Sequence, residues 1–346
     1  MGLDIGTSGV RAAELSLGKG PATLERFGQV ALPVGAVRDG EVIDSDAVSA
    51  AIKQLWAQAK FSTKKVVVGV ANQKVVVRQV DLPWLPVNEL RKSLSFQVQD
   101  FIPMPVEQAI LDFHPLEEFT NDAGGRMLRV LLVAAARDMV GSAMDAVTKA
   151  GLQPAMVDLT SFAVLRSLVT SSGIGTMEAE ALVDVGASVT NIVVHQGGVP
   201  RFVRILLMGG ADITDAVAER LGVPTEQAET VKQGNGLSNG GMVESHPASR
   251  AIEQMGGAFV EEVRGSLDYY LAQPGAARIG RVVLSGGGSR LGGLVERLSV
   301  ATRLPVDVAR PMSVLKIGKT GLTDDQLAYV EPMVAVPVGL AMGVAS

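Results

Sequence analysis

The feature that most constrains this chain is a short motif that occurs twice, about 180 residues apart. The first copy runs Leu3-Asp4-Ile5-Gly6-Thr7-Ser8-Gly9 and the second Leu182-Val183-Asp184-Val185-Gly186-Ala187-Ser188. Each reads as an apolar strand, an Asp and a tight turn of small residues, followed by another strand. Such a turn presents several backbone N–H groups to one point, which suits a phosphate, and the Asp can hold a hydrated divalent cation beside it. An ordinary tight hairpin would explain one copy, but the repeat predicts two similar lobes that close on one nucleotide.

The composition narrows the class of protein. At 346 residues the chain is long enough for about two domains with substantial cores. A content of 47% hydrophobic but only 4% aromatic residues is typical of α/β proteins. A net charge of −5 without a basic stripe argues against nucleic-acid binding, and the lack of cysteine excludes disulfides and thiolate metal sites. The longest apolar runs, such as 130–136 and 334–344, are too short to span a bilayer. No signal peptide precedes the first strand, so we expect a cytoplasmic protein without direct membrane insertion.

The residue pattern of the first half predicts a lobe that a smaller unit interrupts. Strands are expected over 1–35, a helix over 44–59 with Asp44 or Ser45 as its N-cap, and further strands over 66–70 and 75–80. The next part is of α+β type. It contains helices over 88–101 and 138–150 and strands over 110–116, 127–135 and 154–159. This region reads as an inserted subdomain of two helices on a short sheet, after which a helix over 160–171 returns to the first lobe.

The second half repeats the first lobe's beginning. Strands over 191–195 and 199–207 are followed by helices over 212–221 and 226–232, an exposed loop over 233–250 and a long helix over 251–271. A strand over 281–284 runs into Gly286-Gly287-Gly288-Ser289-Arg290, which opens a helix that reaches 299. A strand over 306–308 and an apolar closing helix over 332–346 end the chain. The small residues Gly339, Ala341 and Gly343 would let that helix approach a neighbour closely.

This ordered set of motifs resembles the actin-like ATPase superfamily. The resemblance implies an α/β, actin-like two-lobe fold with duplicated ribonuclease-H-like lobes, and ATP or ADP with Mg²⁺ bound between them. It assigns the nucleotide contacts to Gly6, Thr7, Ser8, Gly9 and Arg11, to Gly186, Ala187 and Ser188, to Gly209, Gly210, Glu229 and Lys232, and to Gly286, Gly287, Gly288, Ser289 and Arg290. The metal contacts fall on Asp4 and Asp184. The implied domains are a first-lobe core (1–78 and 158–180), an insert (79–157), a second-lobe core (181–211 and 281–346) and a second-lobe subdomain (212–280).

The sequence of the insert indicates which family of the superfamily this chain resembles. Its sequence resembles the PilM family of type IV pilus assembly proteins in Val77-Arg78-Gln79-Val80-Asp81-Leu82-Pro83, in Phe101-Ile102-Pro103 and in Leu111-Asp112-Phe113. The chain departs from that pattern at Gln97, where Glu is frequent, and at Arg11, where Lys is usual. This resemblance implies an ATP-binding scaffold of a type IV pilus or related type II secretion complex, held at the inner membrane through a partner. It also implies that the insert and first lobe bind the N-terminal cytoplasmic peptide of a PilN-like membrane protein, with other pilus assembly components as further partners.

Other functions fit the sequence less well. A sugar or acetate kinase needs an acceptor pocket and a general base, and no insert offers an obvious His or Asp for that role. A filament former of the cell-division FtsA or cell-shape MreB type is the main alternative, but an FtsA-like protein would end in a basic amphipathic helix, and this chain ends in Gly-Leu-Ala-Met-Gly-Val-Ala-Ser. No residue stands out as the one that positions an attacking water, so catalytic residues stay unassigned and we expect at most slow ATP hydrolysis.

Overall fold

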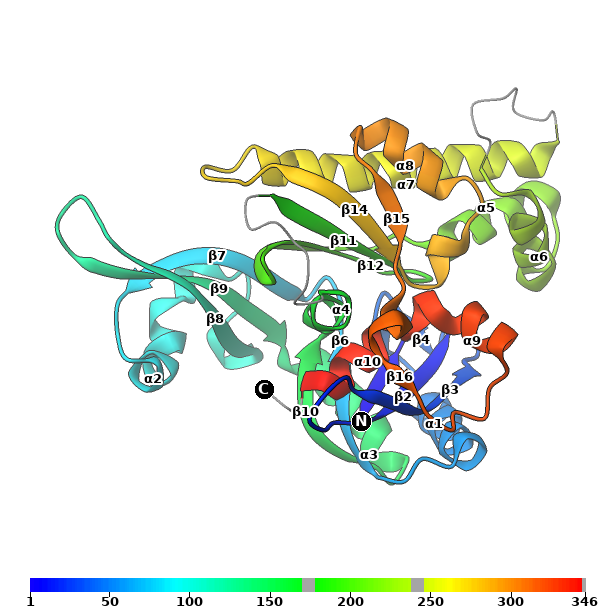
Figure 1. Ribbon diagram of the computed structural model, residues 1–346, viewed down its shortest axis with the longest axis horizontal. Coiled ribbons are helices and arrows are strands. Elements are labelled where there is room, and N and C mark those ends of the chain that lie inside the picture. Colours follow the sequence, from blue (N-terminus) through cyan, green and yellow to red (C-terminus); the bar gives the residue numbers. More distant parts are fainter. Residues whose placement is uncertain (170–177, 238–245, 344–346) are drawn as a thin grey trace.

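The computed structural model describes residues 1–169, 178–237 and 246–343. It contains two large sheets, one in each lobe, and a separate three-stranded sheet that extends to one side (Figure 1). None of the helices in these ranges is both long and apolar enough to cross a membrane.

The first lobe is built on a six-stranded sheet with the order β10-β6-β1-β2-β3-β16. Its strands are β1 (Gly2–Ile5), β2 (Gly9–Ser16), β3 (Thr23–Ala31), β6 (Lys65–Val70), β10 (Gln153–Leu159) and β16 (Lys316–Ile317). The helices α1 (Ser45–Ala59) and α3 (Arg137–Lys149) pack together on one face and share a core with β1, β2 and β6. Two further helices, α4 (Thr160–Leu168) and α10 (Ala335–Met342), cover the other face.

Helix α1 begins and ends where its sequence dictates. The Asp44 side chain accepts hydrogen bonds from the backbone N–H groups of Asp46 at 3.1 Å and Ala47 at 2.9 Å, which satisfies two donors that a helix start leaves free. Lys60 ends the helix in a left-handed conformation with φ +52°. The apolar positions between these caps, Val48, Ile52 and Leu55, are fully buried.

The second lobe repeats this arrangement. Its sheet has the order β13-β12-β11-β14-β15, from β11 (Ala179–Val185), β12 (Thr190–Gln196), β13 (Val199–Leu206), β14 (Ile279–Ser285) and β15 (Val306–Val308). The strand order β10-β6-β1-β2-β3 of the first sheet corresponds to the order β15-β14-β11-β12-β13 of the second. The two motif hairpins, β1–β2 and β11–β12, therefore occupy equivalent places in their sheets. This confirms the predicted duplication. The second lobe also carries α5 (Gly210–Leu221), α6 (Thr225–Asn235), α7 (Pro247–Leu271) and α8 (Leu294–Thr302).

The two lobes meet across α4 and α10. Side chains of both helices share one hydrophobic core with Val67 of the first sheet and with Leu182 and Val193 of the second. The approach of α10 to α4 requires a glycine, because a Cβ at Gly339 would overlap the Ala163 carbonyl. The predicted role of small residues in the closing helix is therefore confirmed at Gly339.

The inserted sheet differs from the prediction in its extent. It has the order β7-β9-β8, from β7 (Val75–Pro83), β9 (Arg126–Ala136) and β8 (Ala109–Thr120), with α2 (Val87–Gln97) against it. We expected the helix over 138–150 and the strand over 154–159 to lie with this sheet. Instead, α3 packs on α1, and β10 pairs in parallel with β6 of the first lobe. Local periodicity specified both elements correctly, but it carries no information about which sheet edge a strand joins. The domain boundaries themselves stay a prediction.

Several short elements were not expected. They are β4 (Val37–Arg38), β5 (Glu41–Val42), β16 and α9 (Asp324–Val330). The predicted helix over 88–101 ends at Gln97 and continues as a 3₁₀ turn over Gln99–Phe101. The range 233–250 predicted for a loop is too long at both ends, because α6 extends to Asn235 and α7 begins at Pro247. Positions 238–245 of this range lie outside the described residues. The closing helix predicted over 332–346 is a 3₁₀ turn over Glu331–Val334 followed by α10.

Candidate nucleotide site

The first motif forms a tight hairpin whose two ends are linked by an arginine. Asp4 on β1 stands opposite Arg11 on β2, and the Gly6 N–H donates to the Gly9 carbonyl at 3.0 Å. Arg11 lies with Nη1 3.7 Å from the Asp4 carboxylate and Nη2 3.5 Å from Ser8 Oγ. Its Nε is buried without a hydrogen-bond partner. The hairpin thus holds a cationic side chain with one unused donor.

The second motif has the same geometry. Asp184 on β11 stands opposite Asn191 on β12, and the Gly186 N–H donates to the Val189 carbonyl at 3.0 Å. Asn191, which takes the place of Arg11, accepts a hydrogen bond from Ser161 Oγ of α4 at 3.0 Å. Sequence reasoning did not include Asn191 among the contacts, although it closes the repeated motif.

The carboxylates of the two hairpins lie close enough to influence each other. The pKa of Asp184 is raised to about 6, chiefly by burial and also by the charge of Asp4, against the lowering effects of a hydrogen bond from Ser285 and of the charge of Arg11. Burial also raises the pKa of Asp4, against the lowering effects of the Arg11 charge and hydrogen bond. The fold therefore brings together the two aspartates that the sequence predicted as a pair, in a setting that disfavours their negative charge.

The turns themselves carry the predicted small residues. Thr7 and Ser8 lie at the tip of the first hairpin, and Ala187 and Ser188 at the tip of the second. Ser8 is exposed, and the other three are half-buried.

The first turn of α5 is anchored on the second hairpin. The N–H of Gly210 donates to the Gly186 carbonyl at 3.0 Å, and that of Ala211 donates to the Ala187 carbonyl at 2.7 Å. A Cβ at Gly209 would lie 2.5 Å from both carbonyl oxygens. A glycine at position 209 is therefore needed for the close approach of the helix to the hairpin, whereas a Cβ at Gly210 would have its nearest neighbour, Lys232 Nζ, at an ordinary contact distance of 3.5 Å. This approach places the start of α5 beside the predicted phosphate turn.

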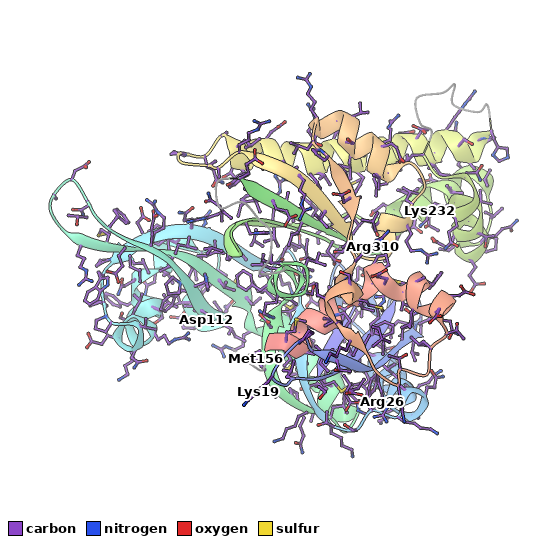
Figure 2. The ribbon with its side chains drawn as sticks, viewed as in Figure 1. Lys19, Arg26, Asp112, Met156, Lys232 and Arg310 are labelled. Carbon is purple, nitrogen blue, oxygen red and sulfur yellow. The ribbon has the colours of Figure 1, made fainter. Side chains whose placement is uncertain are left out.

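Lys232 and Glu229 form a network with α5. Lys232 Nζ donates to the Gly210 carbonyl at 2.9 Å, to Thr214 Oγ1 at 2.8 Å and to Glu229 Oε2 at 2.7 Å. Burial raises the pKa of Glu229, but hydrogen bonds from Lys232, Thr214 and Gln233 outweigh it and leave the pKa below its ordinary value. Both predicted residues thus lie at the α5–α6 junction, where Figure 2 shows Lys232 within the second lobe.

The glycine-rich loop after β14 packs directly on the second hairpin. Gly286 has φ +80°, and a Cβ there would overlap the Val185 carbonyl. A Cβ at Gly288 would overlap the Val185 side chain. Gly287 is exposed, and a Cβ added there would have its nearest neighbour 3.7 Å away. Ser289 closes the turn by donating from Oγ to the Gly286 carbonyl at 2.7 Å. The third motif therefore lies beside the second.

Arg290 has a different contact. Its guanidinium lies 3.7 Å from the centroid of the Tyr329 ring of α9, a cation–π arrangement. This side chain links the glycine-rich loop to a helix that the sequence did not predict.

The two aspartates are of the ligand type that Mg²⁺ with a nucleotide would use. Magnesium keeps several waters and is bound through one or two carboxylates together with substrate phosphates. Asp4 and Asp184 provide two carboxylates, and no group of three or more His, Asp or Glu able to hold a metal occurs in the described parts of the chain. The Arg11 guanidinium, with Nη2 3.5 Å from Ser8 Oγ in the first turn, supplies a positive charge that fits an anion beside that turn. Sequence reasoning omitted Ser285 and Thr214, which hold Asp184 and Lys232 in place.

Known proteins share this architecture. The PilM–PilN type IV pilus biogenesis complex contains a chain with 28% identity and a TM-score of 0.87, and the match covers 100% of this chain and 98% of that one. MreB5 of Spiroplasma citri bound to AMPPNP matches with 12% identity and a TM-score of 0.55, covering 98% of this chain and 93% of that one, which is a likeness of fold.

Sequence relatives include cell-division proteins. The cell-division protein FtsA of Streptococcus pneumoniae is 26% identical over 85% of this chain and 72% of its own length. FtsA of Bacillus subtilis is 24% identical over 67% of this chain, which spans 56% of that protein. The family described as type IV pilus assembly protein PilM matches residues 2–344. Its match spans both hairpins, the glycine-rich loop and the inserted sheet, and the chain belongs to the PilM family of type IV pilus assembly proteins.

Proposed function

We propose that this protein binds ATP or ADP with Mg²⁺ between its lobes and acts as a scaffold of a type IV pilus, or related type II secretion, inner-membrane complex. The observation that carries the nucleotide proposal is the pairing of the two Asp-headed hairpins, in which the charge of Asp4 acts on Asp184. A divalent cation between these carboxylates would relieve the unfavourable burial of their charge.

The residues of the site have distinct tasks in this proposal. The backbone N–H groups of the two hairpin turns would hold phosphate oxygens, and Arg11 would add a cation beside the first turn. Asp4 and Asp184 would hold the hydrated Mg²⁺, which supplies positive charge against the phosphates. Glu229, Lys232 and the loop Gly286–Arg290 would contact the ribose and base.

Calorimetric titration with MgADP tests the nucleotide proposal. Asp184→Ala should weaken binding by about tenfold or more, because the cation loses one of its two carboxylate anchors. Asp268→Ala, an exposed acid on α7, removes the same charge elsewhere and should leave the affinity unchanged. Equal affinities for the two variants would reject the second hairpin as part of the site.

The partner proposal concerns the junction of the insert with the first lobe. We propose that the N-terminal cytoplasmic peptide of a PilN-like membrane protein binds there and holds this protein at the cytoplasmic face of the inner membrane. Two observations support it. Strand β8 is an edge of the inserted sheet and β10 an edge of the first-lobe sheet, so both can accept an extended peptide. Each edge also carries an exposed apolar side chain, Ile110 (39% exposed) and Met156 (38% exposed); Figure 2 labels Met156.

Fluorescence anisotropy with a labelled peptide of the partner's first residues, about twenty and so ample for one strand, tests this. Binding should be saturable and should weaken in Met156→Glu. Val34→Glu places a similar change at an apolar side chain that is 96% exposed in a turn outside β10, and this variant should bind the peptide normally. Absence of binding with and without MgATP would refute the partner proposal. Concentration-dependent filaments in sedimentation assays would favour the FtsA-like or MreB-like alternative.

A further inference from the structure

A cavity of about 860 Å³ lies on the first lobe, and Tyr329 in its lining contacts Arg290 of the glycine-rich loop. Its walls come from β3, from the end of α1 and from the segment 319–330 that contains α9. This volume is within the range of protein binding pockets. None of the residues predicted to contact nucleotide or metal lines it.

One wall of the cavity is a strand edge. Strand β16 pairs with β3 only at Thr23 and Leu24, whereas β3 continues to Ala31. Beyond Leu24 the outer edge of β3 has no strand partner among the residues that the structure describes. The four consecutive residues 26–29 of this edge all line the cavity. An unpaired edge is a template for another extended chain.

The remaining walls are suited to side chains of such a chain. Helix α9 contributes the exposed Tyr329 and α1 contributes Ala59, while the lining residues Leu55 and Val330 are themselves buried. The groove between a strand edge and a helix is the geometry by which β-strand addition occurs, with backbone hydrogen bonds to the edge and side chains in adjoining pockets.

The charges in the cavity favour an acidic occupant. Arg26, Lys60 and Lys319 line it, against a single carboxylate from Asp325. Arg26 is engaged by Glu14, with Nη1 3.3 Å from the carboxylate. Lys60 and Lys319 are exposed, and within the described ranges neither forms an ion pair.

We propose that an extended segment of a partner protein, alternating acidic and apolar residues, pairs with the free edge of β3 in this groove. About four residues would pair, at roughly 3.3 Å per residue. Apolar side chains contact Ala59 and the exposed Tyr329, and carboxylates reach Lys60 and Lys319. This groove is at the opposite end of the six-stranded sheet from β10, so both peptides could be bound at once.

The test uses a fluorescein-labelled synthetic hexapeptide of alternating glutamate and valine, with intact protein and anisotropy as the readout. The double variant Lys60→Glu with Lys319→Glu should weaken binding about tenfold or more, since two favourable charge contacts become repulsive. The same variant should bind the corresponding lysine–valine peptide better than the unaltered protein does. Lys19→Glu with Lys53→Glu makes the same charge change on the same lobe outside the cavity and should have no effect; Figure 2 shows Lys19 well apart from Arg26.

A second peptide tests strand pairing without altering the protein. N-methylation at alternate residues removes backbone donors but keeps the charges, and it should abolish binding. No saturable binding of the unmodified peptide, or equal binding by the charge-reversal and control variants, would overturn the proposal. Equally strong binding of the methylated peptide would also overturn the proposal. So would the result that the groove binds the sulfonated fluorophore anilinonaphthalene sulfonate, or anionic lipid vesicles, but does not bind the peptide.

Discussion

Ser285 Oγ donates a hydrogen bond to the Asp184 carboxylate across 2.8 Å, and both side chains are buried. This contact joins the end of β14, from which the glycine-rich loop starts, to the carboxylate of the second hairpin. It fixes one oxygen of Asp184 and favours the ionised form of a group whose pKa burial raises.

Ser285→Ala should therefore weaken MgADP binding by about tenfold, because a hydrogen bond to a charged group contributes about 1.5–3 kcal/mol. Calorimetry at fixed pH and salt measures the effect. Ser266→Ala removes another buried hydroxyl, one that donates to the Glu262 carbonyl within α7. It should lower stability without changing affinity. An unaltered affinity in Ser285→Ala would show that this bond does not position Asp184.

Gly209→Ala should destabilise the protein by about 1–3 kcal/mol, the usual cost of forcing an added carbon into a close-packed place. The new Cβ would meet the carbonyls of Gly186 and Ala187 at 2.5 Å and push α5 off the hairpin. Nucleotide binding should weaken as well.

Gly265→Ala serves as the opposite control. It lies inside α7 with open space at the Cβ position, so it should stabilise the protein by up to about 1 kcal/mol. Urea unfolding of both variants measures the two changes. A stability of Gly209→Ala equal to that of the unaltered protein would show that the hairpin can adjust.

Glu180 should make stability depend on acidity. Burial raises its pKa, but hydrogen bonds and charges from His195 and Arg281 outweigh this, so its pKa in the folded protein lies below the ordinary value of 4.5. The unfolded chain then binds more protons than the folded one as the pH falls through this region. Ionised Glu180 therefore contributes fully to the stability of the folded protein above about pH 4.5, and this contribution is lost as the pH falls through the folded-state pKa of Glu180.

Glu180→Gln should therefore lower stability at neutral pH and flatten the loss of stability in acid. Urea unfolding at a series of pH values from neutral to acidic shows this as a smaller slope. Glu262→Gln, at an exposed position of α7, is the comparison. Identical acid slopes for the unaltered protein and Glu180→Gln would contradict the assignment.

ATP hydrolysis should be slower than about one turnover per second, within the low range of enzyme rates. Efficient hydrolysis needs a residue that orients the attacking water. Asp158, near the end of β10, does not offer a free carboxylate for this role, because it forms an ion pair with Arg166. Arg166 also donates a hydrogen bond to the Gly339 carbonyl at 3.0 Å. A phosphate-release assay under saturating MgATP measures the rate, and rapid turnover would show that another group fills this role.

The sequence predicted the hairpins because their signals are local. An Asp, a Gly turn and flanking strands specify the geometry of residues 4–11 and 184–191 without reference to the rest of the chain. The helix cap at Asp44 was predictable for the same reason.

The misplaced elements depend on contacts distant in sequence. Strand β10 joins β6 across more than eighty residues, and the partnership of Ser285 with Asp184 spans 101. The short elements β16 and α9 have too few residues for a periodic pattern. The stacking of Arg290 on Tyr329 could not be inferred because α9 itself was not predicted.

The return of the chain to the first lobe has a consequence for biosynthesis. The second-lobe sheet is complete once Val308 has been made, and all its strands lie within 179–308. The first-lobe sheet gains β16 only at Lys316–Ile317, and the second face of its core waits for α10. Domains usually fold in the order in which the ribosome delivers them. In this protein the lobe that begins the chain is the last to be completed.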